Sequence, residues 1–260
     1  MKFFLAPMQG LTGYTVRNAF HHHFDYIDKY YTPFIPAAKR MNAKIKRDID
    51  PVNNDGITLI PQAMSIVADE VIDLHRQLVP YGYDEINVNL GCPSGTVVSK
   101  KRGSGILAYP DMLDSFLDEL YTKADFPVSI KTRVGFNDDE LWPKLIEIYS
   151  KYPISELTVH PRVQKDFYKN TPRMDDFALA MQKINPDKTT LCYNGDITDT
   201  NSFNALTDCF PDIDEIMIGR GLFANPALIA ELKGISMDKA ELRAVSYTHL
   251  RAHETVLDLV

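Results

Sequence analysis

The sequence predicts an α/β protein whose parallel strands close into a (β/α)8 barrel, the TIM-barrel architecture. Short apolar, β-branched runs alternate with segments of 3.6-residue periodicity, which is the pattern of a parallel sheet with covering helices. Eight such runs fall within about 225 residues, the usual size of this barrel. The chain has 260 residues and is 45% hydrophobic, which suits one large domain. An open, doubly wound sheet is the alternative fold.

The predicted strands follow one another at regular intervals. They are residues 3–8, 24–31, 57–64, 85–90, 128–134, 155–161, 189–195 and 215–221. The second strand is the weakest, because it is aromatic and charged and the following residues, 32–56, are irregular. Between strands, residues 68–82 place Val71, Leu74 and Leu78 on one helical face, as expected for a helix that covers a sheet.

Charge and cysteine content narrow the class of protein. The net charge is -7, so the chain is not coated with phosphate-binding charge. No run of 18 or more apolar residues occurs, so no membrane span is expected. The cysteines Cys92, Cys192 and Cys209 cannot all pair and lack the spacing of metal ligands. We therefore predict a cytoplasmic protein without a metal site, in which Cys192 and Cys209 are packing residues.

Polar residues gather where the predicted strands end, which is where such barrels carry their active sites. Lys131 and Arg133 are two residues apart in an apolar strand, so they point to the same side. Two cations on one side favour an anionic or electron-rich ligand, although a pair of internal salt bridges is the alternative. His160 ends the sixth strand, and both a structural and a functional role are open for it. The remaining strand-end residues are Pro7, Met8, Gln62, Asn89, Cys92, Arg162, Asn194 and Arg220.

Two glycine turns follow the last two predicted strands. One is Asn194-Gly195-Asp196 and the other is Gly219-Arg220-Gly221. Loops at these positions are the recurrent phosphate site of TIM barrels, and an arginine there suits a phosphate. Each turn alone could be a simple turn, but together they predict a phosphate-bearing ligand.

Several motifs in this order resemble the tRNA-dihydrouridine synthases, flavin enzymes that reduce uridine in tRNA. The matching segments are LAPMQGLT (5–12), NVNLGCP (87–93), GSGIL (103–107), VSIKTRVGF (128–136), LTVHPRVQKDFY (157–168), YNGDI (193–197) and MIGRGLFANP (217–226). They extend over nearly the whole predicted barrel.

The resemblance implies a role for each matching residue. FMN would contact Pro7, Met8, Gln62, Asn89, Lys131, His160, Asn194, Gly195, Asp196, Gly219 and Arg220. Arg133 would approach the flavin or the target base. Cys92 would act as the general acid, giving a proton to C5 while reduced FMN, recharged by NADPH, gives hydride to C6.

Basic residues outside the barrel mouth are candidates for RNA contact. Runs 39–47 and 99–102 are the densest, and such runs are also common on solvated faces. If the target uridine leaves the tRNA stack to be reduced, Lys100 and Arg102, with Lys39, Arg40, Lys44 and Lys101, would contact phosphates. We expect tRNA and NAD(P)H as partners, no membrane, and a monomer.

The sequence also predicts a division of the chain near its end. Residues 1–235 are expected to form the FMN-binding barrel, and 236–244 the start of a C-terminal helical domain that grips tRNA in the family. Residues 245–255, VSYTHLRAHET, match a translated sequencing adapter, so 245–260 is interpreted as a non-native tail.

Two other functions are compatible with the same residues. One is a flavin barrel enzyme that reduces a free pyrimidine or an enone, which turnover of free uracil would reveal. The other is a tRNA-binding protein that retains an inactive barrel, which a flavin spectrum bleached by NADPH would exclude.

Overall fold

The computed structural model describes residues 1–24, 26–37 and 40–235. These residues divide into two compact units, each with its own parallel strands and helices. Unit 1 comprises residues 1–34, 42–60 and those from 196 onward, and unit 2 comprises residues 35–41 and 61–195. Within these residues, no helix is long and apolar enough to cross a lipid bilayer. The predicted boundary at 235/236 and the tail lie outside the described residues.

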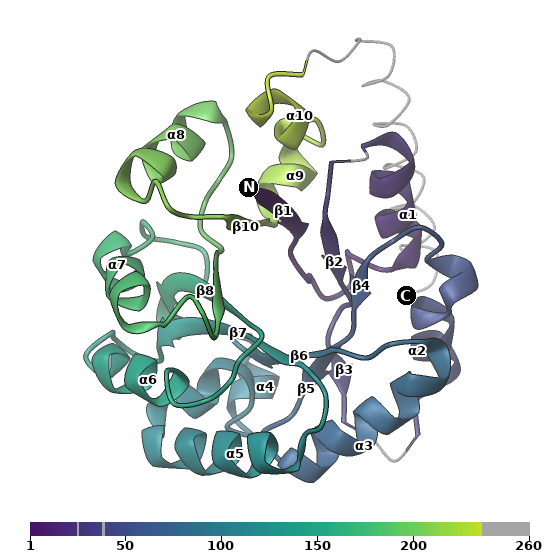
Figure 1. Cartoon of the computed structure of the whole chain (residues 1–260), viewed down its shortest axis with the longest axis vertical. Coiled ribbons are helices and arrows are strands. Elements are labelled where there is room, and N and C mark those ends of the chain that lie inside the picture. The colour runs from purple at the N-terminus through teal and green to yellow at the C-terminus, as the bar shows by residue number, and fades with distance from the viewer. Residues whose placement is uncertain (25, 38–39, 236–260) are drawn as a thin grey trace. The chain divides into compact units, whose positions relative to one another are not determined.

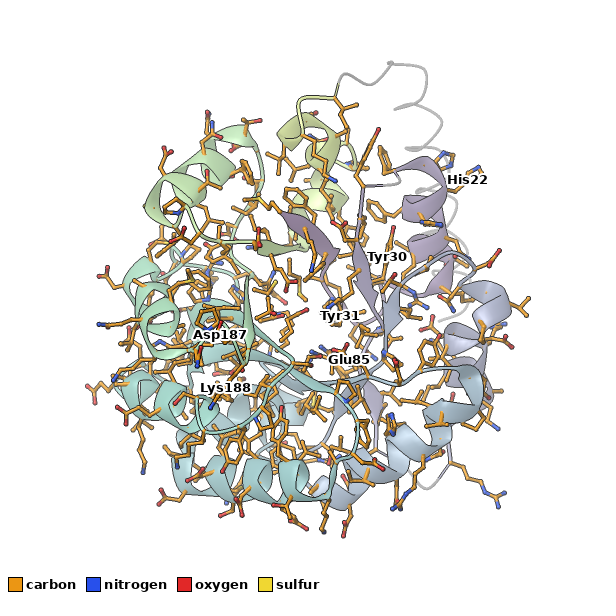
Figure 2. All side chains as sticks on the ribbon, in the orientation of Figure 1. His22, Tyr30, Tyr31, Glu85, Asp187 and Lys188 are labelled. Atoms are coloured by element: carbon orange, nitrogen blue, oxygen red, sulfur yellow. The ribbon has the colours of Figure 1, made fainter. Side chains whose placement is uncertain are left out.

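Unit 1 contains four parallel strands in the order β10-β1-β2-β4. Its elements are β1 (Lys2–Leu5), α1 (Tyr14–His23), β2 (Lys29–Tyr31), α2 (Ala43–Ile49), the 3-10 helix η1 (Pro51–Asn53), β4 (Leu59–Ile60), α8 (Thr200–Cys209), β10 (Glu215–Ile218), α9 (Arg220–Ala224) and α10 (Leu228–Leu232). Neighbouring residues of β2 point to opposite faces, as in any strand. Tyr31 packs on Phe4 of β1, whereas Tyr30 packs on His21 of α1. Figure 2 labels the two tyrosines on β2.

Unit 2 contains six parallel strands in the order β3-β5-β6-β7-β8-β9. Its elements are β3 (Ile35–Pro36), β5 (Gln62–Met64), α3 (Ala68–Leu78), η2 (Val79–Tyr81), β6 (Ile86–Leu90), α4 (Gly95–Val98), η3 (Gly103–Ala108), α5 (Pro110–Lys123), β7 (Val128–Gly135), α6 (Trp142–Tyr149), β8 (Glu156–Val163), η4 (Gln164–Asp166), α7 (Met174–Lys183) and β9 (Thr190–Tyr193). Helices α3, α5, α6 and α7 pack in succession along one face of these strands (Figure 1).

The two faces of the unit 2 sheet differ in chemistry. Val88, Ile130 and Leu157 lie fully buried on the face that the helices cover. Thr132 on the same face has its hydroxyl 2.9 Å from the Tyr149 hydroxyl of α6. Residues paired in register share a face, so Asn89 and Lys131 lie on the opposite one. Polar side chains therefore occupy the face that the helices leave uncovered.

Each predicted strand coincides with an observed strand, with shorter bounds in several cases. The predicted strand 57–64 is observed as two short strands, β4 and β5, with Pro61 between them. Proline has no backbone N–H to donate to a ladder, so it interrupts a strand. The helical face of Val71, Leu74 and Leu78 is confirmed as buried.

The predictions for the two cysteines outside the motifs have different outcomes. Cys192 is buried in β9, as expected for a packing residue. Cys209 is exposed at the end of α8, so the prediction that it packs inside was wrong. Leu206 is the residue of α8 that is buried, and Cys209 is the last residue of the helix, a position that helical periodicity alone does not reveal.

Candidate functional site

Cys92 lies just after β6, on a loop that hydrogen bonds fix from both sides. The Asn89 side-chain oxygen accepts from the backbone N–H groups of Gly91 and Cys92, at 3.1 and 2.9 Å. The Cys92 carbonyl accepts from both the N–H and the hydroxyl of Ser104, at 3.1 and 2.8 Å. Gly103 has a φ of +55°, and a Cβ there would lie 2.7 Å from the Cys92 carbonyl oxygen. The backbone that carries the thiol therefore requires glycine at position 103.

A chain of buried amides supports this loop from below. The Asn89 amide donates to the Gln62 side-chain oxygen at 2.8 Å, and Gln62 donates in turn to Asn87 at 2.8 Å. Asn87 then donates to the Ser129 hydroxyl at 3.0 Å. Gln62 and Asn89 were predicted as flavin ligands, and their contact with a flavin stays a prediction. Asn87 and Ser129 were missed, although Asn87 lies two residues before Asn89 and so points to the same side.

Lys131 is a half-buried cation beside this chain, in register with Asn89. Among the residues that the structure describes, no side chain or carbonyl accepts a hydrogen bond from its ammonium group. Burial, and then the positive charge of Arg133, lower the pKa of Lys131 to about 7. An ammonium held this way gains most from an electron-rich or anionic partner.

The thiol of Cys92 is held in its protonated form. Burial raises its pKa above the ordinary value, and this effect exceeds the opposing effects of a hydrogen bond at Ser94 and the charges of Arg133 and Lys131. The thiol is thus a proton carrier at neutral pH. The two cations would stabilise the thiolate that remains after the proton leaves.

Arg133 is buried and donates hydrogen bonds to three backbone carbonyls. Its Nε donates to the Gly91 carbonyl at 3.0 Å, and its two Nη groups donate to Val163 at 3.0 Å and to Phe167 at 2.8 Å. One guanidinium therefore joins the end of β6 to the loop after β8. Its predicted contact with the substrate stays a prediction, and the structure assigns it a role in holding these loops.

His160 and Arg162 form a second polar pair at the end of β8. Arg162 lies 3.2 Å from the His160 Nε2, and an arginine can only donate. The Nε2 must therefore accept, so the proton of the neutral imidazole is on Nδ1. Arg162 also donates to the carbonyls of Lys169 and Asn170, at 2.9 and 2.6 Å. His160 is thus oriented by the buried Arg162. Arg162 was identified from the sequence as a strand-end residue, but this contact was not predicted.

The expected residues of unit 1 also lie after parallel strands. The turn after β1 is closed by Thr12, whose hydroxyl accepts from the Met8 N–H at 2.9 Å, with Pro7 just before it. A Cβ on Gly219, after β10, would lie 3.3 Å from Ala6 Cβ and 3.6 Å from Met8 Sδ. Gly219 therefore packs directly against the Pro7–Met8 turn.

The two glycine turns differ in their contacts. In unit 1, Arg220 is paired with Asp196 at 2.6 Å, so two predicted phosphate-arm residues engage each other. In unit 2, Asn194 is buried, and a Cβ on Gly195 would collide with the Tyr193 hydroxyl. A side chain at position 195 would therefore have to displace the buried Tyr193 ring.

Most of the predicted RNA-contacting residues that the structure describes are exposed, namely Arg40, Lys44, Lys100 and Lys101, whereas Arg102 is half-buried. Arg102 forms an ion pair with Glu70 at 3.0 Å, so its charge is already partnered. Lys100 is exposed, and the Lys101 ammonium lies 4.4 Å from the centre of the Tyr109 ring. Lys39 lies outside the described residues.

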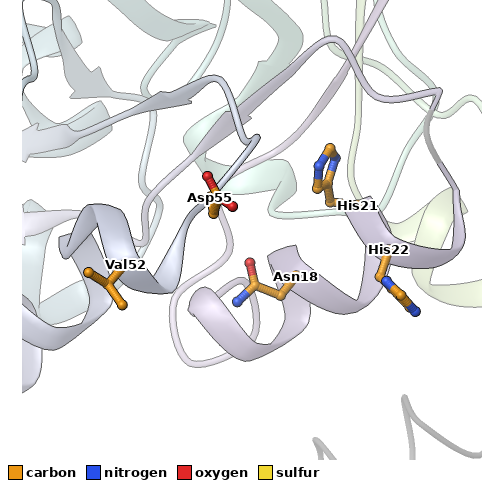
Figure 3. Close-up of a pocket in the computed structure, with 5 residues that line it drawn as sticks. All are labelled: Asn18, His21, His22, Val52 and Asp55. Carbon is orange, nitrogen blue, oxygen red and sulfur yellow. The ribbon is translucent and has the colours of Figure 1, made fainter.

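A separate pocket lies in unit 1, and none of the residues that line it was predicted for the site. It is lined by Asn18, His21, His22, Val52 and Asp55 (Figure 3). Within the described part of the chain, no group of three His, Cys, Asp or Glu side chains could hold a metal ion.

Comparisons with known proteins give one consistent family. The family model "Dihydrouridine synthase (Dus)" matches residues 4–257. The chain is 26% identical to tRNA-dihydrouridine synthase B of Pasteurella multocida, over 90% of the chain and 69% of that protein. It is 34% identical to a probable tRNA-dihydrouridine synthase of Staphylococcus aureus, over 58% of the chain and 46% of that protein. With the Escherichia coli K12 synthase B it shares 30% identity, over 66% of the chain and 53% of that protein. The chain thus spans about half the length of several curated relatives.

A likeness to a solved structure bears on the fold. Morphinone reductase matches with a TM-score of 0.60 at 11% identity, over 93% of this chain and 88% of that one. The likeness confirms the predicted α/β fold class of the TIM-barrel type over the doubly wound alternative.

Proposed function

The chain belongs to the dihydrouridine synthase family, and from that premise we propose that it reduces uridine to 5,6-dihydrouridine in tRNA. The observation that carries the proposal is the state of Cys92. Its thiol follows a buried strand, its backbone is fixed by Asn89 and Ser104, and burial keeps it protonated beside two cations. Such a group is suited to deliver one proton to a carbon atom that hydride addition has made basic.

We infer that the cofactor is FMN and that NADPH is the electron donor. Among the described residues, none accepts a hydrogen bond from the Lys131 ammonium group. A flavin ring has electron-rich nitrogen and oxygen atoms that could accept one. Arg162 fixes the orientation of the His160 ring and the tautomer with the proton on Nδ1. We assign the flavin ring to Lys131, Gln62, Asn89, His160, Pro7 and Met8, and the phosphate arm to Asn194, Gly195, Asp196, Gly219 and Arg220. When bound, FMN supplies hydride chemistry, carrying reducing equivalents from NADPH to C6 of uracil.

The protein's own part is to place the base and move one proton. Cys92 Sγ gives its proton to C5 on the face opposite the hydride, so the C5–C6 double bond becomes single. The thiolate left behind is stabilised by the charges of Arg133 and Lys131 and regains its proton from solvent. The uridine must leave the base stack to reach a strand end, and Lys100 would contact phosphates nearby.

A spectroscopic experiment tests this function. The protein loaded with FMN should lose its visible flavin absorption when NADPH is added without oxygen. Unmodified tRNA should restore the absorption, and free uracil should not. A flavin that NADPH cannot reduce, or equal reoxidation by free uracil, would refute the proposal.

A further inference from the structure

The loop that follows β8 presents two aromatic rings to solvent. Phe167 is 48% exposed and its neighbour Tyr168 is 52% exposed. Lys165 and Lys169, also exposed, flank them in the sequence. Adjacent exposed aromatic side chains can mark a binding surface, because contact with a partner removes their apolar area from water.

The backbone of this loop is held in an unfavourable conformation. Phe167 has a φ of +51° and Asn170 a φ of +57°. A bulky residue rarely adopts positive φ, since its Cβ crowds the backbone, and such strain concentrates at functional sites. The surrounding structure therefore holds Phe167 in a backbone conformation that phenylalanine disfavours, and this conformation sets the direction of its ring.

Three buried or half-buried arginines impose that conformation. Arg133 binds the Phe167 carbonyl, and Arg162 binds the carbonyls of Lys169 and Asn170. Arg173 pairs with Asp166, which also accepts from the Asn170 amide at 2.6 Å. The loop is thus rigid where its aromatic residues emerge.

The same contacts place the loop beside the thiol. The guanidinium that holds the Phe167 carbonyl also holds the Gly91 carbonyl, next to Cys92. Gln164 donates to the Pro93 carbonyl at 2.9 Å. The rings of His160 and Tyr168 have centroids 6.3 Å apart and an angle of 29° between their planes.

We propose that Phe167 and Tyr168 form a stacking surface for an unpaired base of the RNA, the one adjacent in sequence to the uridine being reduced. Lys165 and Lys169 contact the phosphates beside that base. Rigid aromatic rings with flanking cations are the combination that holds single-stranded nucleotides, since every base offers a π face. The proposal rests on the proposed function, because it assumes that a uridine is brought to Cys92.

The test measures binding of an unmodified tRNA transcript together with the kinetics of uridine reduction. Phe167→Ala should weaken binding about tenfold, as expected for the loss of one stacked base, and raise KM while kcat stays unchanged. Phe167→Trp should bind as well as the wild type, which also shows that the loop folds. Leu141→Ala removes another exposed apolar side chain, 38% exposed, and should change nothing.

An altered RNA identifies the contacted base. A transcript with an abasic nucleotide next to the target uridine should bind the wild type about tenfold less tightly than the intact transcript does. Phe167→Ala should bind both transcripts with the same affinity. The stacking proposal would be refuted if the wild type and Phe167→Ala bound the intact transcript equally well. It would also be refuted if the abasic nucleotide weakened binding to Phe167→Ala as much as it weakens binding to the wild type. A wild type that binds the transcript and never reduces it would refute the proposed function, and the affinity comparison would still decide the stacking surface.

Discussion

Burial acts on Cys92 and Lys131 in opposite directions. It raises the pKa of the thiol and lowers that of the ammonium, so it favours the uncharged form of both groups. For the thiol this means a proton available at neutral pH. For the lysine it means that the charged form is destabilised in the folded protein, and that an anionic or electron-rich partner would stabilise it.

Replacing the thiol by a hydroxyl tests the role of Cys92. Cys92→Ser keeps the side chain's shape, but an alcohol holds its proton too tightly to replace a thiol. Uridine reduction in a single turnover should slow by about 100-fold or more, while FMN reduction by NADPH is unchanged. In the wild type the rate should fall as pH rises through the thiol pKa, and this decline should be absent in the variant. A serine variant as fast as the wild type would exclude the thiol as proton donor.

The pKa of Lys131 predicts how FMN affinity depends on pH. The free protein loses the lysine proton near pH 7, and a flavin that accepts a hydrogen bond from the ammonium raises that pKa. Binding then takes up a proton, so the FMN dissociation constant should increase as pH rises above 7, by up to about tenfold per pH unit. Fluorescence titrations at several pH values measure this. Lys131→Met should show a flat profile, and a flat wild-type profile would place the flavin elsewhere.

The sequence was informative about single residues to different degrees. Cys92, Lys131 and His160 could be selected because a polar group at the end of an apolar strand is conspicuous. The partners of Arg133 could not be predicted, since they are carbonyls of Gly91, Val163 and Phe167, and any residue type supplies a carbonyl. The contact of Arg102 with Glu70 joins residues 32 positions apart, and charge runs do not reveal it.

At the scale of elements, the conformation of the loop after β6 depends on a close approach between Gly103 and the Cys92 carbonyl. Gly103 provides both a positive φ and the space for the Cys92 carbonyl. Gly82 is a natural comparison, because its φ is +86° and a Cβ there would meet no atom within 4 Å. Substitution at Gly82 therefore tests the effect of positive-φ strain alone, and substitution at Gly103 adds a collision with the loop that carries Cys92.

Gly103→Ala and Gly82→Ala should accordingly differ in activity. Gly82→Ala should lose about 1 kcal/mol of stability in urea unfolding, because alanine at positive φ is strained, and Gly103→Ala should lose more, because its Cβ also meets the Cys92 carbonyl oxygen. Only Gly103→Ala should also lose uridine reduction, since its methyl group displaces the backbone of Cys92. Full activity in Gly103→Ala would mean that the loop tolerates a different path.

Strand positions were predictable because apolar, β-branched runs mark them, and β6, β7 and β8 fall where expected. The division of the third predicted strand into β4 and β5 was not recognised, although Pro61 was visible as a residue that cannot join a ladder. The short strand β3 was also missed, since two residues, Ile35 and Pro36, carry no periodicity.

For the whole molecule, the fold class could be predicted because the same pattern recurs along the chain, and no single segment decides it. The division into two units could not, since each unit combines segments that are distant in sequence. The family match over residues 4–257 agrees with the order of motifs, which extend from Leu5 to Pro226.

The most direct test of the account is the mass of the RNA product. The protein should be incubated with FMN, NADPH and tRNA that lacks dihydrouridine, and the digested RNA analysed by mass spectrometry. We expect one uridine-containing fragment to gain about two daltons, the two hydrogens added across C5 and C6, with the gain lost in Cys92→Ala. An unchanged mass with the wild type, or an equal gain with Cys92→Ala, would contradict the claim that this thiol completes the reduction of a uridine.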